Sequence, residues 1–359
     1  MESAPLSTMG DQFDKAKGEK SEAPKLHRVA AVVVTYNRKA LLRQCLEALQ
    51  SQTHPVAETI VIDNASSDGT TAMLEQEFPK VMVHRLELNR GGAGGFREGI
   101  RRAAERDVDW IWVMDDDAEP LPDALEELVH FSCSKGEKVA ALASRKVGPE
   151  GKDQISHIGK YNPVRMSKTK LTWTENEGAI DYSSFVGLAI RRNATKEVGL
   201  PEEGFFIWGD DVEYALRLRT YGTLKYVPDS VVVHHDAFAS KRKQARLGSK
   251  AWRTRPINQY WRKYYELRNP LLILNRYVQS VQGRVLGYVV ALWRALLAVM
   301  AVLILDTRKF PRLFLIGAAL HHGVRGLSGH YVRPEHFPER LHPENLHQLL
   351  PRGKSARNK

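Results

Sequence analysis

The sequence predicts an α/β domain with a mostly parallel sheet flanked by helices, followed by a basic, amphipathic helical region. Two observations predict this fold. Short apolar runs alternate with stretches of helical spacing from residue 28 to about 131, and the last third mixes cations, aromatics and long apolar runs. Strands that are apolar throughout are buried on both faces, as happens where helices connect parallel strands. The 359 residues suffice for one large domain with added elements, or for two domains.

Four strands are predicted in the first part of the chain, each with a helix and a polar loop after it. The strands cover 29–34, 59–63, 81–86 and 110–114, and the helices cover 41–52, 69–78, 96–107 and 121–131. The loops after the strands read "TYNR", "DNASSDG", "NRGGAGG" and "DDDAEP". Ligands of parallel sheets bind at the carboxyl ends of the strands, so these loops are expected to meet at one ligand-binding edge.

Three consecutive carboxylates, Asp115, Asp116 and Asp117, follow the apolar run "WIWVM". Such a cluster is unfavourable at the end of a buried strand unless a cation compensates it. Oxygen ligands of this kind suit Mg²⁺ or Mn²⁺, with substrate phosphates completing the coordination. The alternative is a solvated acidic cap on the following helix. The sequence favours a divalent metal that holds a diphosphate.

Two of the other loops offer groups for the rest of a nucleotide. Asp63 can accept a hydrogen bond from a base imide, and Asn64 can both donate and accept. The glycines in 91–95 let the backbone approach a ligand and open a helix whose N-terminus attracts anions, with Arg97 one turn inside it. The alternative for both loops is a simple turn.

A second acidic pair, Asp210 and Asp211, begins a predicted helix after Trp208. Carboxylates in a first helical turn are favoured by the helix dipole alone. The functional interpretation is a general base that takes a proton from a sugar hydroxyl, with Trp208 as a platform for the acceptor. His234 and His235 end the next predicted strand and provide an imidazole for the metal.

The ordered series "VVVTYNR", "IVIDNASSDGT", "NRGGAGGF", "DDD", "WGDDVEYALR" and "VVVH" resembles a family-2 glycosyltransferase of the GT-A fold, over residues 28 to about 240. Within that family, "NRGGAGGF", the aspartate triplet and "GDDVEY" are similar to bacterial galactofuranosyltransferases that act on lipid-linked acceptors. Rhamnosyltransferases share much of this pattern.

The resemblance implies a role for each matching residue. Those expected to contact the nucleotide sugar or the acceptor sugar are Thr35, Asp63, Asn64, Arg90, Arg97, Asp115, Asp116 and Trp208. The expected metal ligands are Asp115, Asp117 and His234, with His235 in reserve. Asp211 is the expected base. Asp210 is the second candidate, because some members of the family have Glu-Asp where this chain has Asp210-Asp211. The resemblance also implies inversion at the anomeric carbon in a single displacement.

The C-terminal third is strongly basic, with 23 Lys/Arg against 6 Asp/Glu from Asp236 onward. Such a charge suggests an anionic partner. The apolar run 285–305 is long enough to span a membrane, but Arg294 near its middle would cost about 2.5–3.5 kcal/mol on insertion scales, and basic residues flank both ends. The sequence favours helices that lie on the membrane interface or pack on the catalytic domain.

The predicted organisation is a disordered tail (1–27), a GT-A domain (28–240), a helical membrane-associated region on the acceptor side (241–350) and a basic tail (351–359). The predicted protein is a metal-dependent enzyme peripheral to the cytoplasmic face of the membrane. It transfers galactofuranose from UDP-galactofuranose to a polyprenyl-diphosphate-linked glycan for cell-wall or surface polysaccharide synthesis, and nucleic acid is not an expected partner. The nearest alternative uses dTDP-rhamnose.

Two other classes of protein are disfavoured. A dinucleotide-dependent oxidoreductase would need a third glycine where Arg97 stands, and its glycine-rich loop would follow the first strand. A non-catalytic basic protein that binds membranes or nucleic acid would leave both groups of aspartates unexplained.

Overall fold

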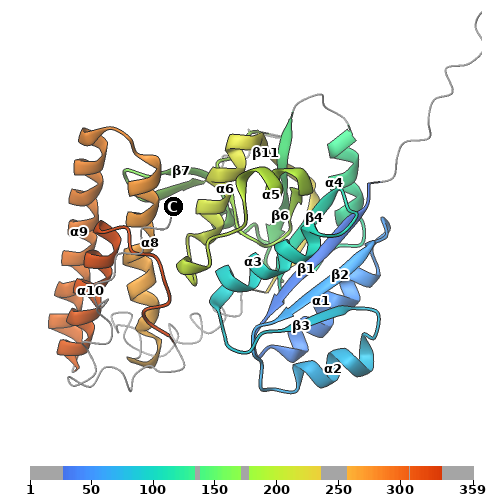
Figure 1. The fold of residues 1–359 in the computed structure, drawn as a ribbon, viewed down its shortest axis with the longest axis horizontal. Coiled ribbons are helices and arrows are strands. Elements are labelled where there is room, and N and C mark those ends of the chain that lie inside the picture. Colours follow the sequence, from blue (N-terminus) through green and yellow to red (C-terminus); the bar gives the residue numbers. More distant parts are fainter. Residues whose placement is uncertain (1–26, 134–137, 171–177, 236–256, 307, 334–359) are drawn as a thin grey trace, which may run out of the picture.

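The computed structural model describes residues 27–133, 138–170, 178–235, 257–306 and 308–333 (Figure 1). Residues 1–26 and 351–359 of the two predicted tails lie outside these ranges. The strands are β1 (Val29–Thr35), β2 (Glu58–Asp63), β3 (Met82–Arg85), β4 (Trp110–Asp115), β5 (Ala118–Pro120), β6 (Val139–Val147), β7 (Ile158–Asn162), β8 (Ser167–Lys170), β9 (Tyr182–Ser183), β10 (Leu188–Arg191) and β11 (Thr223–His234). The helices of seven residues or more are α1 (Lys39–Gln50), α2 (Thr70–Glu77), α3 (Gly91–Ala104), α4 (Ala124–Cys133), α5 (Arg192–Val198), α6 (Asp210–Tyr221), α8 (Trp261–Tyr277), α9 (Val281–Leu305) and α10 (Lys309–Val324).

The main sheet has eight strands in the order β3-β2-β1-β4-β10-β6-β11-β5. Strands β1 to β4 pair in parallel, as the sequence predicts, and β6 pairs in parallel with β11. Strands β10 and β5 run antiparallel to their neighbours, so the sheet is mixed. Both antiparallel strands are short, and runs of three or four residues carry too little periodicity to be recognised in a sequence.

Helices cover both faces of this sheet, which is why its central strands are apolar throughout. In β1, Val32 and Val34 pack on the face that carries α3, while Ala31 and Val33 pack on the face that carries α1. Every residue of β1 is buried. The predicted alternation of buried strands and helices is confirmed over β1–α4.

The glycine-rich stretch forms the first turns of α3 rather than a free loop. Gly91 has φ of +71°, and a Cβ there would stand 2.1 Å from the Phe206 carbonyl oxygen. A Cβ on Gly95 would stand 2.5 Å from Val34. These glycines therefore let α3 lie against β1 and against the loop that precedes α6.

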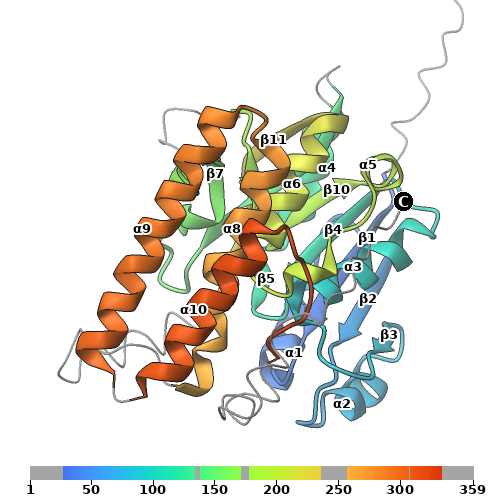
Figure 2. The same ribbon diagram turned by 60° about the vertical axis from the view of Figure 1, so that its left-hand side comes forward.

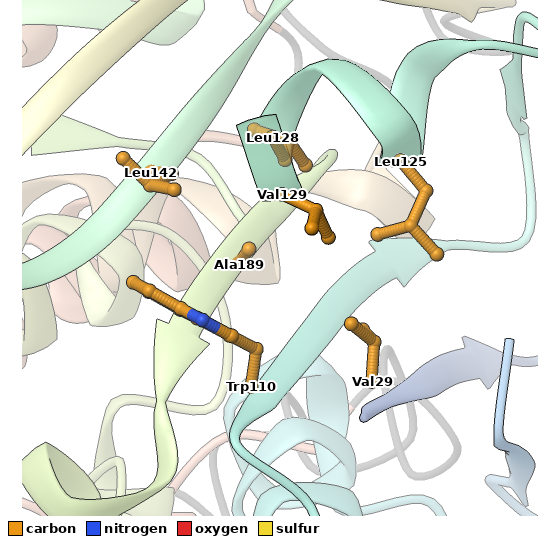
Figure 3. Close-up of a pocket in the computed structure, with 7 residues that line it drawn as sticks. All are labelled: Val29, Trp110, Leu125, Leu128, Val129, Leu142 and Ala189. Atoms are coloured by element: carbon orange, nitrogen blue, oxygen red, sulfur yellow. The ribbon is translucent and has the colours of Figure 1, made fainter. Parts of the chain in front are cut away.

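A small cavity inside the domain is not a ligand site. It lies between α4 and the sheet, away from the carboxyl ends of β1, β2 and β4 (Figure 3). Its lining is apolar apart from the Trp110 indole nitrogen, and consists of Val29, Trp110, Leu125, Leu128, Val129, Leu142 and Ala189. It is a packing defect of the core.

Helices α8, α9 and α10 stand together beside the sheet domain (Figures 1 and 2). α9 contains the predicted apolar run and begins four residues earlier, at Val281. Its buried positions are small or β-branched: Gly287, Ala291, Ala295, Ala298 and Val302. In the part of the chain that the structure describes, α9 alone has the length and hydropathy to cross a membrane, and only 22% of its most apolar window is buried.

Candidate active site

The predicted loops meet at one edge of the sheet. Thr35 at the end of β1 pairs with Asp63 at the end of β2, and Val34 pairs with Asp115 at the end of β4. β11 runs in the same direction, and its last residue, His234, pairs with Ala118 of β5. Residues far apart in the sequence are thus brought to one edge.

Within the protein, the cation that compensates the aspartate triplet is Arg38. Its Nη1 lies 2.9 Å from Asp116 Oδ1 and 2.9 Å from Asp117 Oδ2. Asp116 also accepts hydrogen bonds from the Thr35 hydroxyl (2.8 Å) and the Tyr36 amide (3.3 Å). Burial raises the pKa of Asp116 to about 6 despite the opposing charge of Arg38. Arg38 is not among the site residues predicted from the sequence, although it belongs to the predicted loop "TYNR".

Asp115, Asp117 and His234 form a cluster suited to a divalent metal. One ligand atom from each lies within 4.8 Å of the others, and His234 Nε2 is 3.3 Å from Asp117 Oδ1. Burial, then the charges of Asp117 and Asp116, raise the pKa of Asp115 well above its usual value. A carboxylate–imidazole set whose negative charge is only partly compensated fits Mn²⁺ or Mg²⁺.

Gln154, which the sequence analysis missed, orients His234. Its Oε1 lies 2.6 Å from His234 Nδ1, and its Nε2 donates to the His234 carbonyl oxygen at 2.8 Å. With the proton on Nδ1, the lone pair of Nε2 faces the cluster, as in metal-ligating histidines whose other nitrogen is held by an acceptor. A glutamine in a loop gives no recognisable signal in a sequence.

His235 is not part of this cluster. Its Nε2 lies 2.9 Å from Glu119 Oε2, because neighbouring residues at a strand end point to opposite sides. A different imidazole, His157, lies beside His234 with the ring centroids 4.9 Å apart. Burial lowers the pKa of His157 to about 3, so this ring is neutral.

Asp63 and Asn64 are both buried and hold the loops in place. Asp63 accepts hydrogen bonds from the Ser66 amide and the Thr71 hydroxyl, both at 2.8 Å, and a carboxylate retains further acceptor capacity. Asn64 accepts from the Arg90 amide at 2.8 Å and donates to the Gly91 carbonyl at 3.0 Å. Asn64 therefore ties β2 to the start of α3.

Arg90 and Arg97 both reach toward the segment before α6. Arg90 Nη1 lies 3.6 Å from Glu203 Oε2 and is partly exposed. Arg97 Nη1 donates to the Pro201 carbonyl oxygen at 2.9 Å. Arg90 remains accessible from the sheet edge, whereas Arg97 has a structural hydrogen bond of its own.

The acidic pair begins α6, as predicted, and its two carboxylates differ in surroundings. Asp210 is buried, and burial followed by the charge of Asp211 raises its pKa to about 7. Asp211 is less buried, and the Lys168 ammonium lies 3.9 Å from its Oδ2. Lys146, buried nearby with its Nζ 2.6 Å from Ser183 Oγ, has its pKa lowered to about 7 by burial. Neither lysine is among the residues predicted from the sequence.

A strained loop places Trp208 and the acidic pair. Phe206 and Trp208 have φ near +60°, and Gly209 has φ of +84°. Non-glycine residues rarely adopt this conformation and keep it only where surrounding contacts hold it. Asn269 Nδ2 supplies such contacts, with the carbonyl oxygens of residues 205, 207 and 208 at 2.7–3.0 Å.

Arg268, the residue before Asn269 in α8, fixes the same loop. Its guanidinium is fully buried and donates to the carbonyl oxygens of Gly204 (2.6 Å) and Gly329 (2.7 Å). The helical unit, which consists of α8, α9 and α10, therefore holds the segment that carries Trp208. Trp208 itself is partly exposed.

Comparison with known proteins identifies the domain that this edge belongs to. Residues 30–199 match the model "Glycosyl transferase family 2". These residues, slightly less than half of the chain, form a family-2 glycosyltransferase domain. Its fold is shared with the S. aureus TarS 1-349 crystal structure in complex with UDP, with a TM-score of 0.54 and 13% identity over 90% of this chain and 89% of that one.

Two curated bacterial relatives of the family-2 domain show how far the likeness extends. Galactofuranosyltransferase GlfT1 of Mycolicibacterium smegmatis is 29% identical over 201 residues, which are 54% of this chain and 66% of the relative. The N-acetylglucosaminyl-diphospho-decaprenol L-rhamnosyltransferase of Mycobacterium tuberculosis is 25% identical over 240 residues, 60% of this chain and 78% of the relative. The chain thus matches just under two thirds of the galactofuranosyltransferase.

Proposed function

We propose that this family-2 glycosyltransferase transfers galactofuranose from UDP-galactofuranose to a polyprenyl-diphosphate-linked glycan, with inversion at the anomeric carbon and a divalent metal. The observation that carries the proposal is the meeting of two acidic groups at one sheet edge. Asp115, Asp117 and His234 form one, and Asp210–Asp211 form the other. The charge of Asp210 is among those that raise the pKa of Asp115, so the two groups lie close enough to interact.

In this proposal the nucleotide lies across the ends of β1 and β2, with Asp63 and Thr35 toward the base and Arg90 toward the ribose or diphosphate. Asp116, held by Thr35 and Arg38, fixes the geometry of the triplet. Asp115, Asp117 and His234 would hold Mn²⁺ or Mg²⁺, which supplies positive charge for the departing diphosphate.

Asp211 is the proposed general base. Its carboxylate is less buried than that of Asp210, and the Lys168 ammonium lies 3.9 Å from its Oδ2. It accepts the proton of the acceptor hydroxyl as that oxygen attacks the anomeric carbon from the side opposite the diphosphate. Trp208, partly exposed beside the pair, provides a flat apolar surface for a sugar ring.

The acceptor is proposed to arrive from a membrane. α9 exposes a continuous row of large apolar side chains, among them Val285, Val289, Leu292, Trp293 and Leu296. Contiguous exposed apolar surfaces mark binding sites for membranes or proteins. With the basic C-terminal third, they favour peripheral binding at the cytoplasmic face of the membrane, through an interfacial helix.

One observation favours a second donor, dTDP-rhamnose. The relative whose printed name is a rhamnosyltransferase aligns with a larger share of this chain than the galactofuranosyltransferase does, 60% against 54%. Identity is higher in the galactofuranosyltransferase, so galactofuranose is the preferred proposal.

A donor screen tests the proposal. The purified protein is incubated with UDP-galactofuranose, dTDP-rhamnose or UDP-hexopyranoses, with a lipid-diphosphate glycan, and with Mn²⁺ or with a chelator. Transfer from UDP-galactofuranose that stops with the chelator is the expected result. Transfer from dTDP-rhamnose alone would show that the donated sugar is rhamnose. Transfer undiminished by the chelator would show that the reaction needs no divalent metal.

A further inference from the structure

Arg294 stands in the middle of α9 and is the one charged residue between positions 285 and 305 of the sequence. Its neighbours Leu292 and Trp293 are about 60% exposed on the outer face of the helix. Arg294 points the other way, and its Nη1 donates to the Met166 carbonyl oxygen at 3.2 Å. The charge is therefore kept off the apolar face and turned toward the catalytic domain.

A carbonyl oxygen does not neutralise a guanidinium. Within the described ranges, no carboxylate forms an ion pair with Arg294. A half-buried cation on an apolar helix is costly unless an anion compensates it, and arginine is suited to phosphate because its planar fork can donate two parallel hydrogen bonds. The Arg294 guanidinium is thus suited to bind an anionic ligand.

The β7–β8 hairpin connects Arg294 with the proposed base. Its tip residues Val164 and Met166 pack against Leu271, Leu274 and Ala291 of the helical unit. Figures 1 and 2 show β7 lying between the sheet domain and these helices. The hairpin is therefore seated against α8 and α9 at its tip.

Lys168 lies two residues beyond Met166 on β8, about 7 Å along the strand. Its Nζ is 3.9 Å from Asp211 Oδ2 and 4.4 Å above the Tyr182 ring. Tyr161 stands opposite Lys168 in the hairpin, and the charges of both Arg294 and Asp211 act on its phenol. Arg294, Lys168 and Asp211 therefore all lie near the Tyr161–Lys168 pair of the hairpin.

The hairpin beside the acidic pair is basic. Residues 155–170 contain four Lys/Arg and no Asp/Glu. Of these, Lys160 turns to the other side of the hairpin, where it lies 3.9 Å from Asp181. Lys168 and Arg294 therefore bring two cations to the side that faces Asp211.

We propose that Arg294 and Lys168 form a subsite for the phosphate groups of a lipid diphosphate. The lipid chain would extend toward the apolar face of α9, and the sugar would reach Asp211. The identification of that ligand as the acceptor rests on the proposed function. The recognition itself rests on two cations that contact one hairpin between an apolar helix and the proposed base.

Binding of farnesyl diphosphate tests this subsite without requiring any transfer. The titration is made in UDP and Mn²⁺, so that the proposed donor site is filled, and is repeated with farnesol. We expect the wild type to prefer the diphosphate. Arg294→Gln and Lys168→Gln should each weaken farnesyl diphosphate binding roughly tenfold and leave farnesol unchanged. Glutamine at 294 can still donate to Met166, and circular dichroism checks that the helices remain.

Arg284→Gln is the matched control. Arg284 lies on the same helix but donates to the Gln279 carbonyl oxygen at the start of α9, away from Asp211. It should leave both affinities unchanged. An equal loss in this variant would mean that general positive charge, and no specific subsite, attracts the diphosphate, which overturns the proposal.

Vesicles of phosphatidylcholine with phosphatidylglycerol separate the two sources of phosphate. If Arg294→Gln reduces vesicle binding and leaves farnesyl diphosphate affinity intact, the cations serve bilayer headgroups and the proposal is wrong. If neither changes, Arg294 only ties α9 to the hairpin, and the proposal is again wrong. Diphosphate binding that depends on Arg294, in a protein that transfers no sugar to a lipid-linked acceptor, would support the subsite and reject the proposed function.

Discussion

Asp117 is shared between Arg38 and His234, and this makes it the most informative single position of the aspartate triplet. Asp117→Asn keeps the shape of the side chain and removes its charge. We expect transfer to fall at least about 100-fold and Mn²⁺ binding to weaken, because the proposed metal loses a charged ligand. Titration of Mn²⁺ and the initial rate of transfer measure both effects.

Glu119→Gln is the matched control for that substitution. Glu119 stands two residues away, contacts His235 and lies outside the Asp115–Asp117–His234 cluster. It should retain nearly full activity. If Glu119→Gln lost as much activity as Asp117→Asn, the effect would be one of net charge at the edge.

Asp211 and Asp210 can be distinguished by the same kind of isosteric change. Asp211→Asn should lower the rate of transfer by roughly 10²–10⁴-fold, the usual contribution of a general base. Affinity for the nucleotide sugar should change little, because the proposed donor contacts lie outside α6. Asp210→Asn should cost less. A dead Asp210→Asn beside an active Asp211→Asn would exchange the two roles.

The buried Asp210 also predicts how stability depends on pH. Its pKa is raised to about 7 by burial and by Asp211, so in chelator the folded protein binds this proton more tightly than the unfolded chain, whose carboxyl titrates near 3.8. The resulting stabilisation is complete below about pH 4 and is lost as the pH rises toward 7. Relative to wild type, Asp210→Asn should be more stable at pH 8 than at pH 5, as measured by urea unfolding. An equal difference at both values would contradict the burial of a titrating group.

How much of the site the sequence predicted depends on what each residue does. Asp115, Asp117 and His234 were identified because they end predicted strands, and the register of a parallel sheet brings strand ends together. Arg38 and Gln154 were missed because their roles exist only through contacts about 80 residues away in sequence, which no local pattern reveals. The prediction of His235 as a reserve ligand is wrong, because strand alternation turns its side chain to Glu119.

At the scale of elements, α8 holds the loop before α6 in a conformation that the loop would not keep alone. Asn269→Ala removes the contacts with three carbonyl oxygens of that loop. We expect the loop to relax, transfer to fall roughly 10- to 100-fold, and affinity for the nucleotide sugar to remain. The free energy of unfolding should fall by about 1–3 kcal/mol, because buried carbonyls lose their donor.

Asn275→Ala controls for the loss of stability. Asn275 lies on the same helix, and its Nδ2 donates to the Gly323 and Val324 carbonyls of α10, away from the loop. It should lower stability by a similar amount and leave the rate of transfer nearly unchanged. Equal losses of rate in the two variants would mean that the Asn269 contacts serve the fold alone.

The elements themselves were largely predictable in β1–α4, where each strand is a buried apolar run and each helix has its own spacing. β5 and β10 have only three and four residues, and both enter the sheet antiparallel. Those pairings are decided by contacts between distant segments. The α6 start at Asp210 was predicted, yet the left-handed residues before it depend on α8 and could not be read from the loop.

At the scale of the molecule, the apolar face of α9 and the catalytic edge belong to one connected structure. α9 packs on α8, α8 holds the loop before α6, and the hairpin tip lies between them. A bilayer at the outer face of α9 would therefore lie at a fixed position relative to Asp211. The domain boundaries predicted at 240 and 350 fall in residues outside the described ranges and stay predictions.

Charges on the outer face of α9 test this arrangement. Val289 and Leu296 are both about half exposed, so Val289→Glu with Leu296→Glu should leave folding in water nearly unchanged and weaken binding to vesicles that contain phosphatidylglycerol. Val83→Glu, on the exposed side of β3 at the far end of the sheet, should bind vesicles as the wild type does. Wild-type protein on cell membranes should be released by alkaline carbonate, because an interfacial helix is held by its surface area and by charge. Retention of the wild type after carbonate would show that α9 crosses the bilayer, since a spanning helix is not extracted by pH or salt. α9 would then have to separate from α8.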